Sequence, residues 1–272
     1  MGPPPDDRST GVEPDDSGGV TNQTPEHLHA RLQRLEALVD PELRVLHKAG
    51  DDLLVPAWRR VTEGEPRLPV TLTVAAAIGL QLALPNSVAP HPRWLLPAVA
   101  ALLLVGIFAA NPRRVDRPSP QLRAASLVLI AVISMANGWS AVRLIDRLIH
   151  GSATKDPATL LATGAAIWLT NIVVFALWYW EFDRGGPVAR AQASTTYPDF
   201  LFPQMASPEL APPDWEPAFV DYLYVSFTNA TAFSPTDVLP LSRWAKLAMM
   251  TQSLVSVATV ALVVARAVNI LP

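Results

Sequence analysis

The 272-residue chain contains no cysteine, and only 17% of its residues are charged. Without cysteine there is no disulfide, thiol nucleophile, cysteine-bound zinc or iron–sulfur cluster, so the protein classes that depend on them are excluded. The few charges are unevenly spread. Residues 1–66 carry 7 Lys/Arg and 13 Asp/Glu, whereas residues 67–272 carry 14 and 11. Most of the polar character therefore lies in the first 66 residues.

Catalytic motifs are also lacking. The five histidines are scattered, with no His-Glu-x-x-His pair, and the chain has neither a glycine-rich phosphate loop nor a Gly-x-Ser-x-Gly turn. An isoelectric point near 5.9 and an acidic first segment argue against nucleic acid as a partner. We therefore expect a protein that is not an enzyme, with no metal, no cofactor and no nucleic-acid partner.

The first 66 residues divide into two parts. Residues 1–23 are rich in Pro, Gly, Asp and Ser, so they cannot bury enough apolar surface to offset their ordering entropy and are predicted to be a disordered acidic tail. Residues 24–66 are predicted to form short amphipathic helices on the cytoplasmic side. The stripe of Leu28, Leu32, Leu35 and Val39 fits either a helix on the membrane surface or a small coiled coil that recruits a cytoplasmic partner through residues 24–60.

What the chain has in abundance is long apolar runs. Four of them contain no charge, and a fifth contains only Arg266. At 1.5 Å per residue, even the shortest reaches about 26 Å, just enough to cross a bilayer core. The sequence thus predicts an all-α integral membrane protein whose transmembrane domain, residues 67–272, has five spans, near 68–84, 94–110, 124–142, 160–180 and 247–271.

Lys and Arg near the spans predict the orientation. With the N-terminus in the cytoplasm, eleven of these residues lie inside and four outside, as the positive-inside rule requires. The expected location is therefore the plasma membrane, with the bilayer itself as a partner. Trp94, Trp178, Trp180 and Trp244 fall at span ends and are expected to anchor at the interface, while Asn137 and Asn171 are expected to bond to each other.

The connection between the last two spans contains a short amphipathic segment, residues 217–237. Phe219, Tyr222, Leu223, Ser226 and Phe227 share one helical face, and Asp214 is the expected N-cap. A helix of about eleven residues is half the length of a membrane crossing. Two interpretations fit it equally: a re-entrant half-helix, or a helix that lies in the plane of the interface.

This segment carries a resemblance to known proteins. The motif resembles that of a family of uncharacterised bacterial multi-pass membrane proteins, which have an Asp-Phe-Leu-Tyr-Phe-Ser-Phe-Thr stretch before the last helix. The matching residues are Asp221 to Thr228, Phe233, Thr236, Asp237, Arg243, Lys246 and Ala267 to Ile270. The resemblance covers about the last 100 residues, and it implies a membrane-embedded fold but no biochemical activity.

Residues 226–237 also resemble, more weakly, the pore loop of potassium channels. That likeness implies permeation positions at Thr228, Asn229, Thr231, Ser234, Thr236 and Asp237. A potassium filter needs inward-pointing carbonyls and two glycines, however, and here Ser234 and Thr236 stand in their place. The filter is therefore degenerate, and potassium selectivity is not expected.

The last span bears a polar face formed by Gln252, Ser256, Thr259 and Arg266. Such a face either lines water or forms hydrogen bonds between helices. The leading hypothesis is a channel-like protein, built as a homo-oligomer around the pore-loop-like segment. The alternative is a non-transporting membrane scaffold that binds a partner.

Overall fold

The computed structural model describes residues 55–114, 119–231 and 237–270. The predicted tail, residues 1–23, and most of the predicted amphipathic region, residues 24–66, lie outside the described residues. The chain separates into two compact units, residues 1–53 and 54–272, and the second is the unit described below.

Five apolar helices make up most of the second unit, which confirms the all-α prediction. The helices are α2 (Leu68–Ala83), α3 (Leu95–Ala110), α4 (Pro120–Ile149), α5 (Pro157–Phe182) and α9 (Arg243–Ile270). In the described ranges, α4, α5 and α9 are long and apolar enough to cross a membrane, and α2 and α3 are shorter apolar helices. Each lies over one of the ranges predicted as spans. Ser119 and Asp156 cap the starts of α4 and α5.

Short elements fill the connections. They are η1 (Ala57–Arg59), η2 (Asp183–Gly185), α6 (Pro187–Ala191), β1 (Phe200–Leu201), α7 (Pro203–Ala206), η3 (Pro208–Leu210), α8 (Phe219–Thr231) and β2 (Leu239–Pro240). The two strands pair antiparallel, with Phe200 opposite Pro240 and Leu201 opposite Leu239. This pairing fixes the residues before α9 to the segment that follows α5.

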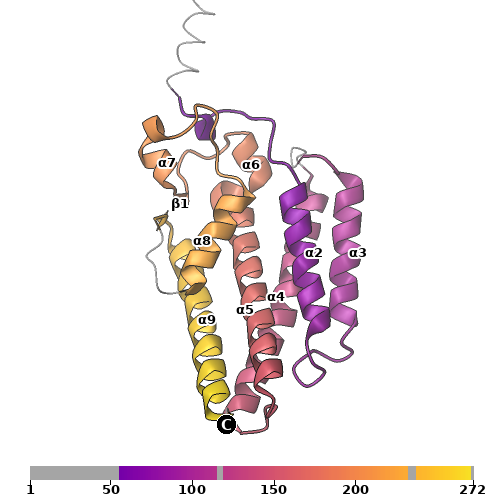
Figure 1. The fold of residues 1–272 in the computed structure, drawn as a ribbon. Helices are drawn as coiled ribbons and strands as arrows, with labels where there is room; N and C mark the ends of the chain where they lie inside the picture. The colour runs from indigo at the N-terminus through magenta and orange to yellow at the C-terminus, as the bar shows by residue number, and fades with distance from the viewer. Residues whose placement is uncertain (1–54, 115–118, 232–236, 271–272) are drawn as a thin grey trace, which may run out of the picture. The chain divides into compact units, whose positions relative to one another are not determined.

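The long helices run alternately up and down (Figure 1). The amide of Arg67 donates to the carbonyl of Arg113, so the start of α2 lies beside the end of α3. Arg123 and Glu181 likewise join the start of α4 to the end of α5. We call the end that holds residues 55–67, 183–218 and β2 the loop-rich end, and the end that holds the α2–α3 and α4–α5 turns the hairpin end.

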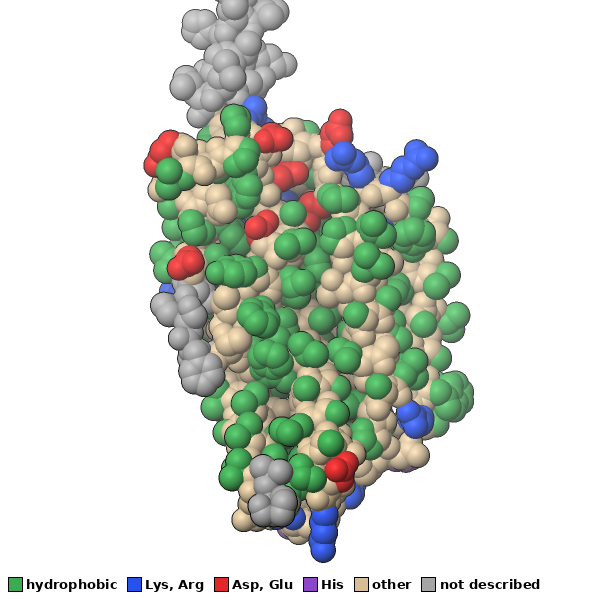
Figure 2. Space-filling model, viewed as in Figure 1, with side chains coloured by type: hydrophobic (Ala, Val, Ile, Leu, Met, Phe, Trp, Pro, Cys, Tyr) green, Lys and Arg blue, Asp and Glu red, His purple; other side chains and the backbone are tan. Residues whose placement is uncertain are grey.

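Helix α5 lies at the centre, packed against α2, α4, α8 and α9. Charged side chains gather at the two ends of the unit, and the surface between them is largely apolar (Figure 2). Large hydrophobic side chains are exposed there, among them Leu102, Val105, Met135, Val142 and Leu254. An apolar exposed belt between two charged ends is typical of a surface that faces lipid.

Three local predictions are wrong. Asp214 does not cap α8, which begins at Phe219, because the Asp221 carboxylate instead accepts from the amide of Ala218 at 2.8 Å. Trp180 is buried rather than interfacial. Asn137 and Asn171 do not bond to each other. Asn137 instead faces α2 and accepts from Gln81 at 3.3 Å, whereas Asn171 faces α9 and donates to the carbonyl of Gln252 at 3.4 Å.

Candidate functional site

Helix α8 is a half-length helix that starts at the loop-rich end. The amide of Phe219 donates to Oε2 of Glu65 there, at 2.9 Å. Its 13 residues span about 20 Å. Its last turn lies against the middle of α9, where Asn229 Nδ2 donates to Oε1 of Gln252 at 2.8 Å. The chain is back at the loop-rich end by β2, so α8 enters the bundle and the chain returns to the end where it began (Figure 1).

Gln252 is the centre of a buried polar network between α5, α8 and α9. Its Oε1 accepts from the Tyr179 hydroxyl at 2.6 Å as well as from Asn229, and its Nε2 donates to the Ser226 carbonyl at 2.8 Å. The Ser226 hydroxyl in turn donates to the carbonyl of Ile172 at 2.6 Å. The amide of Gln252 therefore makes hydrogen bonds with both of the other helices, which fixes α8 to α5 and α9.

The other predicted polar-face residues are also at helix contacts. Ser256 accepts from the Trp168 indole at 2.7 Å and donates to the carbonyl of Ala230. Thr259 is buried and bonds to its own helix, at the carbonyl of Val255. Arg266 lies apart from this group, near the end of α9, and its Nε has no hydrogen-bond partner among the described residues.

The residues predicted for permeation are only partly brought together. Thr228 and Thr231 bond to carbonyls within α8, and Asn229 belongs to the Gln252 network. Asp237 is exposed at the loop-rich end. Ser234 and Thr236 lie outside the described residues. Among the described residues of this set, only Asn229 therefore bonds to another helix.

A second polar cluster, which sequence reasoning missed, is buried at the loop-rich end. Glu65 and Arg190, both almost fully buried, form an ion pair with Oε1 and Nη2 2.7 Å apart. Oε2 of Glu65 also accepts from the Trp180 indole at 2.7 Å. Burial alone would lower the pKa of Arg190, but the acidic groups around it, Tyr222, Glu65 and Asp183, raise it above its usual value. The guanidinium therefore stays charged.

Asp183 and Arg184 extend this cluster. Oδ1 of Asp183 accepts from the amide of Asp199 at 2.8 Å, and Oδ2 accepts from the Tyr222 hydroxyl at 2.6 Å. Arg184 has left-handed backbone angles, φ 52° and ψ 29°, and its Nη1 donates to the carbonyl of Trp58 at 2.6 Å. The segment before α2, the turn after α5 and the start of α8 are therefore tied to one another.

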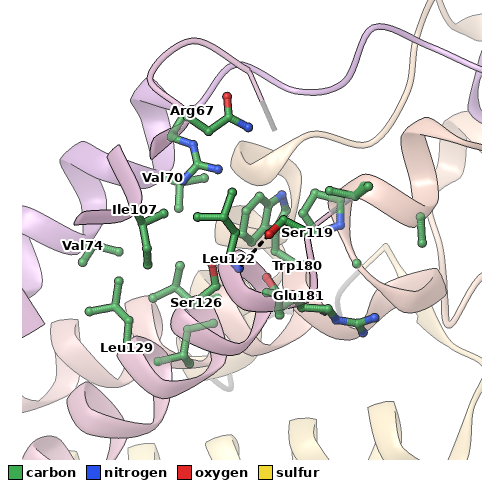
Figure 3. Close-up of a pocket in the computed structure, with 18 of the residues that line it drawn as sticks. Arg67, Val70, Val74, Ile107, Ser119, Leu122, Ser126, Leu129, Trp180 and Glu181 are labelled. Atoms are coloured by element: carbon green, nitrogen blue, oxygen red, sulfur yellow. Dashed lines mark hydrogen bonds and ion pairs between the residues drawn. The ribbon is translucent and has the colours of Figure 1, made fainter. Parts of the chain in front are cut away.

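Beside this cluster lies a cavity of about 430 Å³ (Figure 3). It is enclosed by α2, α3, α4, α5 and the turn before α6. Figure 3 shows Val70, Val74, Ile107 and Leu129 along one side, with Trp180 and Glu181 on the other. The volume falls within the range of about 300–1,000 Å³ that is typical of ligand pockets.

The lining of the cavity changes from polar to apolar with depth. Arg67, Arg123 and Glu181 lie at helix ends, whereas Val74 and Ile130 lie seven residues further along their helices, about 10 Å deeper. The Glu181 carboxylate is almost fully buried, and Arg123 Nε lies 3.8 Å from its Oε1. The site can therefore contact a polar group at its mouth and an apolar group inside.

A glycine shapes the wall nearest Glu181. Gly186 has a positive φ of 99°, and an added Cβ would lie 2.8 Å from the carbonyl oxygen of Glu181. Only glycine lets the backbone before α6 approach the end of α5 this closely. The paired glycines at 185 and 186 were the signal in the sequence that could have indicated a tight turn here.

Comparison of the chain with protein-family models, curated proteins and solved structures gave no match. Within the described residues, no group of three or more His, Asp or Glu side chains is arranged to hold a metal ion. Function must therefore be argued from the helices, the two buried polar groups and the cavity.

Proposed function

We propose that this is an integral membrane protein with five transmembrane helices, in which α8 is a re-entrant half-helix, and that it binds an amphiphilic molecule in the cavity between α2, α3, α4 and α5. Support for the membrane location comes from the apolar lengths of α4, α5 and α9 and from the apolar belt between two charged ends. The loop-rich end is proposed to face the cytoplasm, since most Lys and Arg residues near the spans lie there.

The observation that carries the binding proposal is the polarity of the cavity. Its charged residues lie at the ends of helices, at the depth of lipid headgroups, and its apolar residues lie at the depth of acyl chains. A molecule with one polar and one apolar end would satisfy both parts. A purely polar solute would leave the apolar wall unused, and a purely apolar one would leave Glu181 and Arg123 without a new partner.

The test is to fill the cavity. Ser126 lines it, and Ser126→Phe should occupy the space that a ligand would take. Val128 lies two residues further along α4, is 50% exposed and does not line the cavity, so Val128→Phe is the matched control. Native mass spectrometry of the detergent-purified protein should show a bound amphiphile in the wild type and in Val128→Phe, and none in Ser126→Phe.

Thr71→Phe, on α2, is a second cavity-filling variant, and the melting temperatures of both variants show whether they fold. If both cavity variants keep the wild-type melting temperature and still carry the amphiphile, the binding proposal is wrong. It is equally wrong if the wild-type protein carries none and gains no thermal stability from any added lipid.

A channel-like oligomer is the second candidate function. The observation that favours it is the course of α8, which goes part of the way into the bundle before the chain returns to the same end. Against it stand the hydrogen bonds of Asn229, Ser226 and Gln252, which leave these polar groups engaged within one protomer. Ion or solute flux in liposomes that is lost on Asp237→Ala would favour the channel.

Single cysteines can test the orientation, because the chain has no native cysteine. Glu63→Cys and Asp237→Cys report on the loop-rich end, and Lys155→Cys reports on the hairpin end. A membrane-impermeant thiol reagent should label only Lys155→Cys in intact cells, and all three after the membrane is opened. Labelling of all three in intact cells, or of Asp237→Cys without Glu63→Cys, would contradict the five-span arrangement.

A further inference from the structure

The mouth of the cavity holds charges of both signs. Arg67 and Arg123 supply two guanidinium groups, and Glu181 supplies a carboxylate that is only 4% exposed. Glu181 interacts electrostatically with Arg123 first, and then with Arg190 and Arg67. At this mouth, the Glu181 carboxylate can therefore bind a cationic group of a ligand, and the guanidinium groups beside it can bind an anionic one.

The contact between Arg123 and Glu181 is a loose one. The contact from Arg123 Nε to Glu181 Oε1 is 3.8 Å, longer than a charge-assisted hydrogen bond of about 2.8 Å. Half of the Arg123 side chain is exposed, so the guanidinium has donors left for a second acceptor. Arg123 therefore gives the nearly buried Glu181 carboxylate charge but no short hydrogen bond, and an added cation with N–H donors could supply one.

From this arrangement we infer that the cavity is selective for a phospholipid whose headgroup carries a phosphate and a primary ammonium, an inference that rests on the proposed binding function. The phosphate lies between Arg67 and Arg123, and the ammonium lies at Glu181. Guanidinium groups match phosphate oxygens in two-point geometry, and an ammonium offers three donors to a carboxylate.

The size and polarity of the cavity agree with this ligand. A volume of about 430 Å³ is that of a drug-sized molecule, so it accepts the headgroup and the adjoining part of the chains, but not two whole chains. The apolar wall formed by Val70, Val74 and Leu129 contacts these first methylenes. A headgroup with a quaternary ammonium lacks N–H donors, and one with glycerol lacks the positive charge, so neither can donate a charge-assisted hydrogen bond from a cation to Glu181.

The experiment compares short-chain phospholipids that differ only in the headgroup. Detergent-purified protein is incubated with equimolar ethanolamine, choline and glycerol forms, and the bound fractions are measured by native mass spectrometry. The ethanolamine form should be favoured about tenfold or more over each of the others. Free phosphoethanolamine, which has no chains, is the arm that separates a lipid from a soluble phosphate, and it should bind at least a hundredfold more weakly.

Two variants separate the roles of the charges. Glu181→Gln should keep phospholipid binding but lose the preference for the primary ammonium. Arg123→Gln should weaken binding of all three phospholipids about tenfold, whereas Arg113→Gln, at an exposed position of the same end, should change nothing.

The outcomes distinguish the two proposals. Equal binding of all headgroups, unchanged by Glu181→Gln and blocked by Ser126→Phe, would overturn the headgroup assignment and leave the amphiphile site intact. Tight binding of free phosphoethanolamine would also overturn it, in favour of a soluble phosphate ligand. No binding of any phospholipid would overturn both.

Discussion

The hydroxyl of Tyr179 donates a 2.6 Å hydrogen bond to Oε1 of Gln252, which joins α5 to α9 at the level where α8 ends. The same oxygen accepts from Asn229, so one side chain serves three helices. Loss of this oxygen removes the acceptor of the buried Tyr179 hydroxyl, whereas Asn229 Nδ2 keeps its hydrogen bond to the carbonyl of Met249 at 3.0 Å. Loss of the Gln252 side chain should therefore weaken the attachment of α8 to α5 and α9.

Gln252→Leu should therefore lower the free energy of unfolding by about 1–3 kcal/mol, because the buried Tyr179 hydroxyl loses its acceptor and Asn229 loses one of its two. Thr251→Val is the matched control, since Thr251 is exposed and bonds only to its own helix, at the carbonyl of Leu247. The measurement is reversible unfolding in mixed micelles. Equal stability of the two variants would show that the network contributes little.

Gly164 of α5 lies directly against Val263 of α9. A Cβ at this position would lie 2.9 Å from both methyl carbons of Val263. Gly164→Ala should destabilise the protein by about 1–3 kcal/mol, as overpacking does, and adding Val263→Ala should recover most of the loss. The melting temperatures of the two single variants and the double variant in detergent give this double-mutant cycle.

Gly138→Ala provides the comparison for that cycle, because nothing lies within 4 Å of the added Cβ. It should leave stability unchanged or raise it by up to about 1 kcal/mol, since alanine favours a helix more than glycine does. A loss from Gly164→Ala that Val263→Ala does not repair would refute the contact.

Glu65→Gln should cost about 3 kcal/mol of unfolding free energy, because it removes the carboxylate that is ion-paired with the buried Arg190 and leaves only the more distant charge of Asp183. It also replaces one acceptor oxygen by an amide NH2 group. The remaining oxygen can still accept from Trp180 and from the amide of Phe219, which both donate to Oε2 of Glu65. Glu63→Gln removes an exposed pair with Arg114 and should cost less than about 1 kcal/mol. Comparable losses in the two variants would contradict a special role for the buried pair.

Glu216 should make stability depend on pH. Burial raises the pKa of its carboxyl above the usual 4.5, while a hydrogen bond with Thr62 lowers it in part. The folded protein then holds this proton more tightly than the unfolded chain does. Below the unfolded pKa both states are protonated, so the carboxyl does not change the free energy of unfolding. That free energy falls as pH rises from the unfolded pKa through the folded pKa. Glu216→Gln should raise the melting temperature at pH 7.5 and leave it unchanged near pH 4.

Glu209→Gln, at an exposed position, is the control for that series and should shift the melting temperature equally little at both pH values. A gain from Glu216→Gln that is the same at pH 4 and pH 7.5 would show that the effect is not one of charge.

Sequence reasoning predicted the helices well, because each long apolar run is a local signal that does not depend on its partners. The α8 helix was also found, from the spacing of Phe219, Tyr222 and Ser226. Its cap was misplaced: Asp214 and Asp221 are both plausible caps by residue type, and only the path of the chain after Trp215 decides between them.

The candidate site was not predictable in the same way. Glu65 lies more than 100 residues before Asp183 and Arg190, and all three are next to spans, where charged residues ordinarily face water. The cavity lies where four helices leave a space between their side chains, and no pattern of residues in the sequence predicts such a space. Trp180 was mispredicted for the same reason. Its position at a span end indicated an anchor at the interface, whereas its indole donates a hydrogen bond to Glu65 in the interior.

The pairing of Glu65 with Arg190 joins residues 125 positions apart, and Trp244, later still, bonds to Asp199 in the adjoining group. During synthesis, α2, α3 and α4 are made before Arg190 and Trp244. Glu65 therefore stays hydrated and without its ion-pair partner until most of the chain has left the ribosome. Assembly of the loop-rich end is consequently one of the last events in folding, and a chain that stops short of α9 is expected to be recognised as incomplete by cellular quality control.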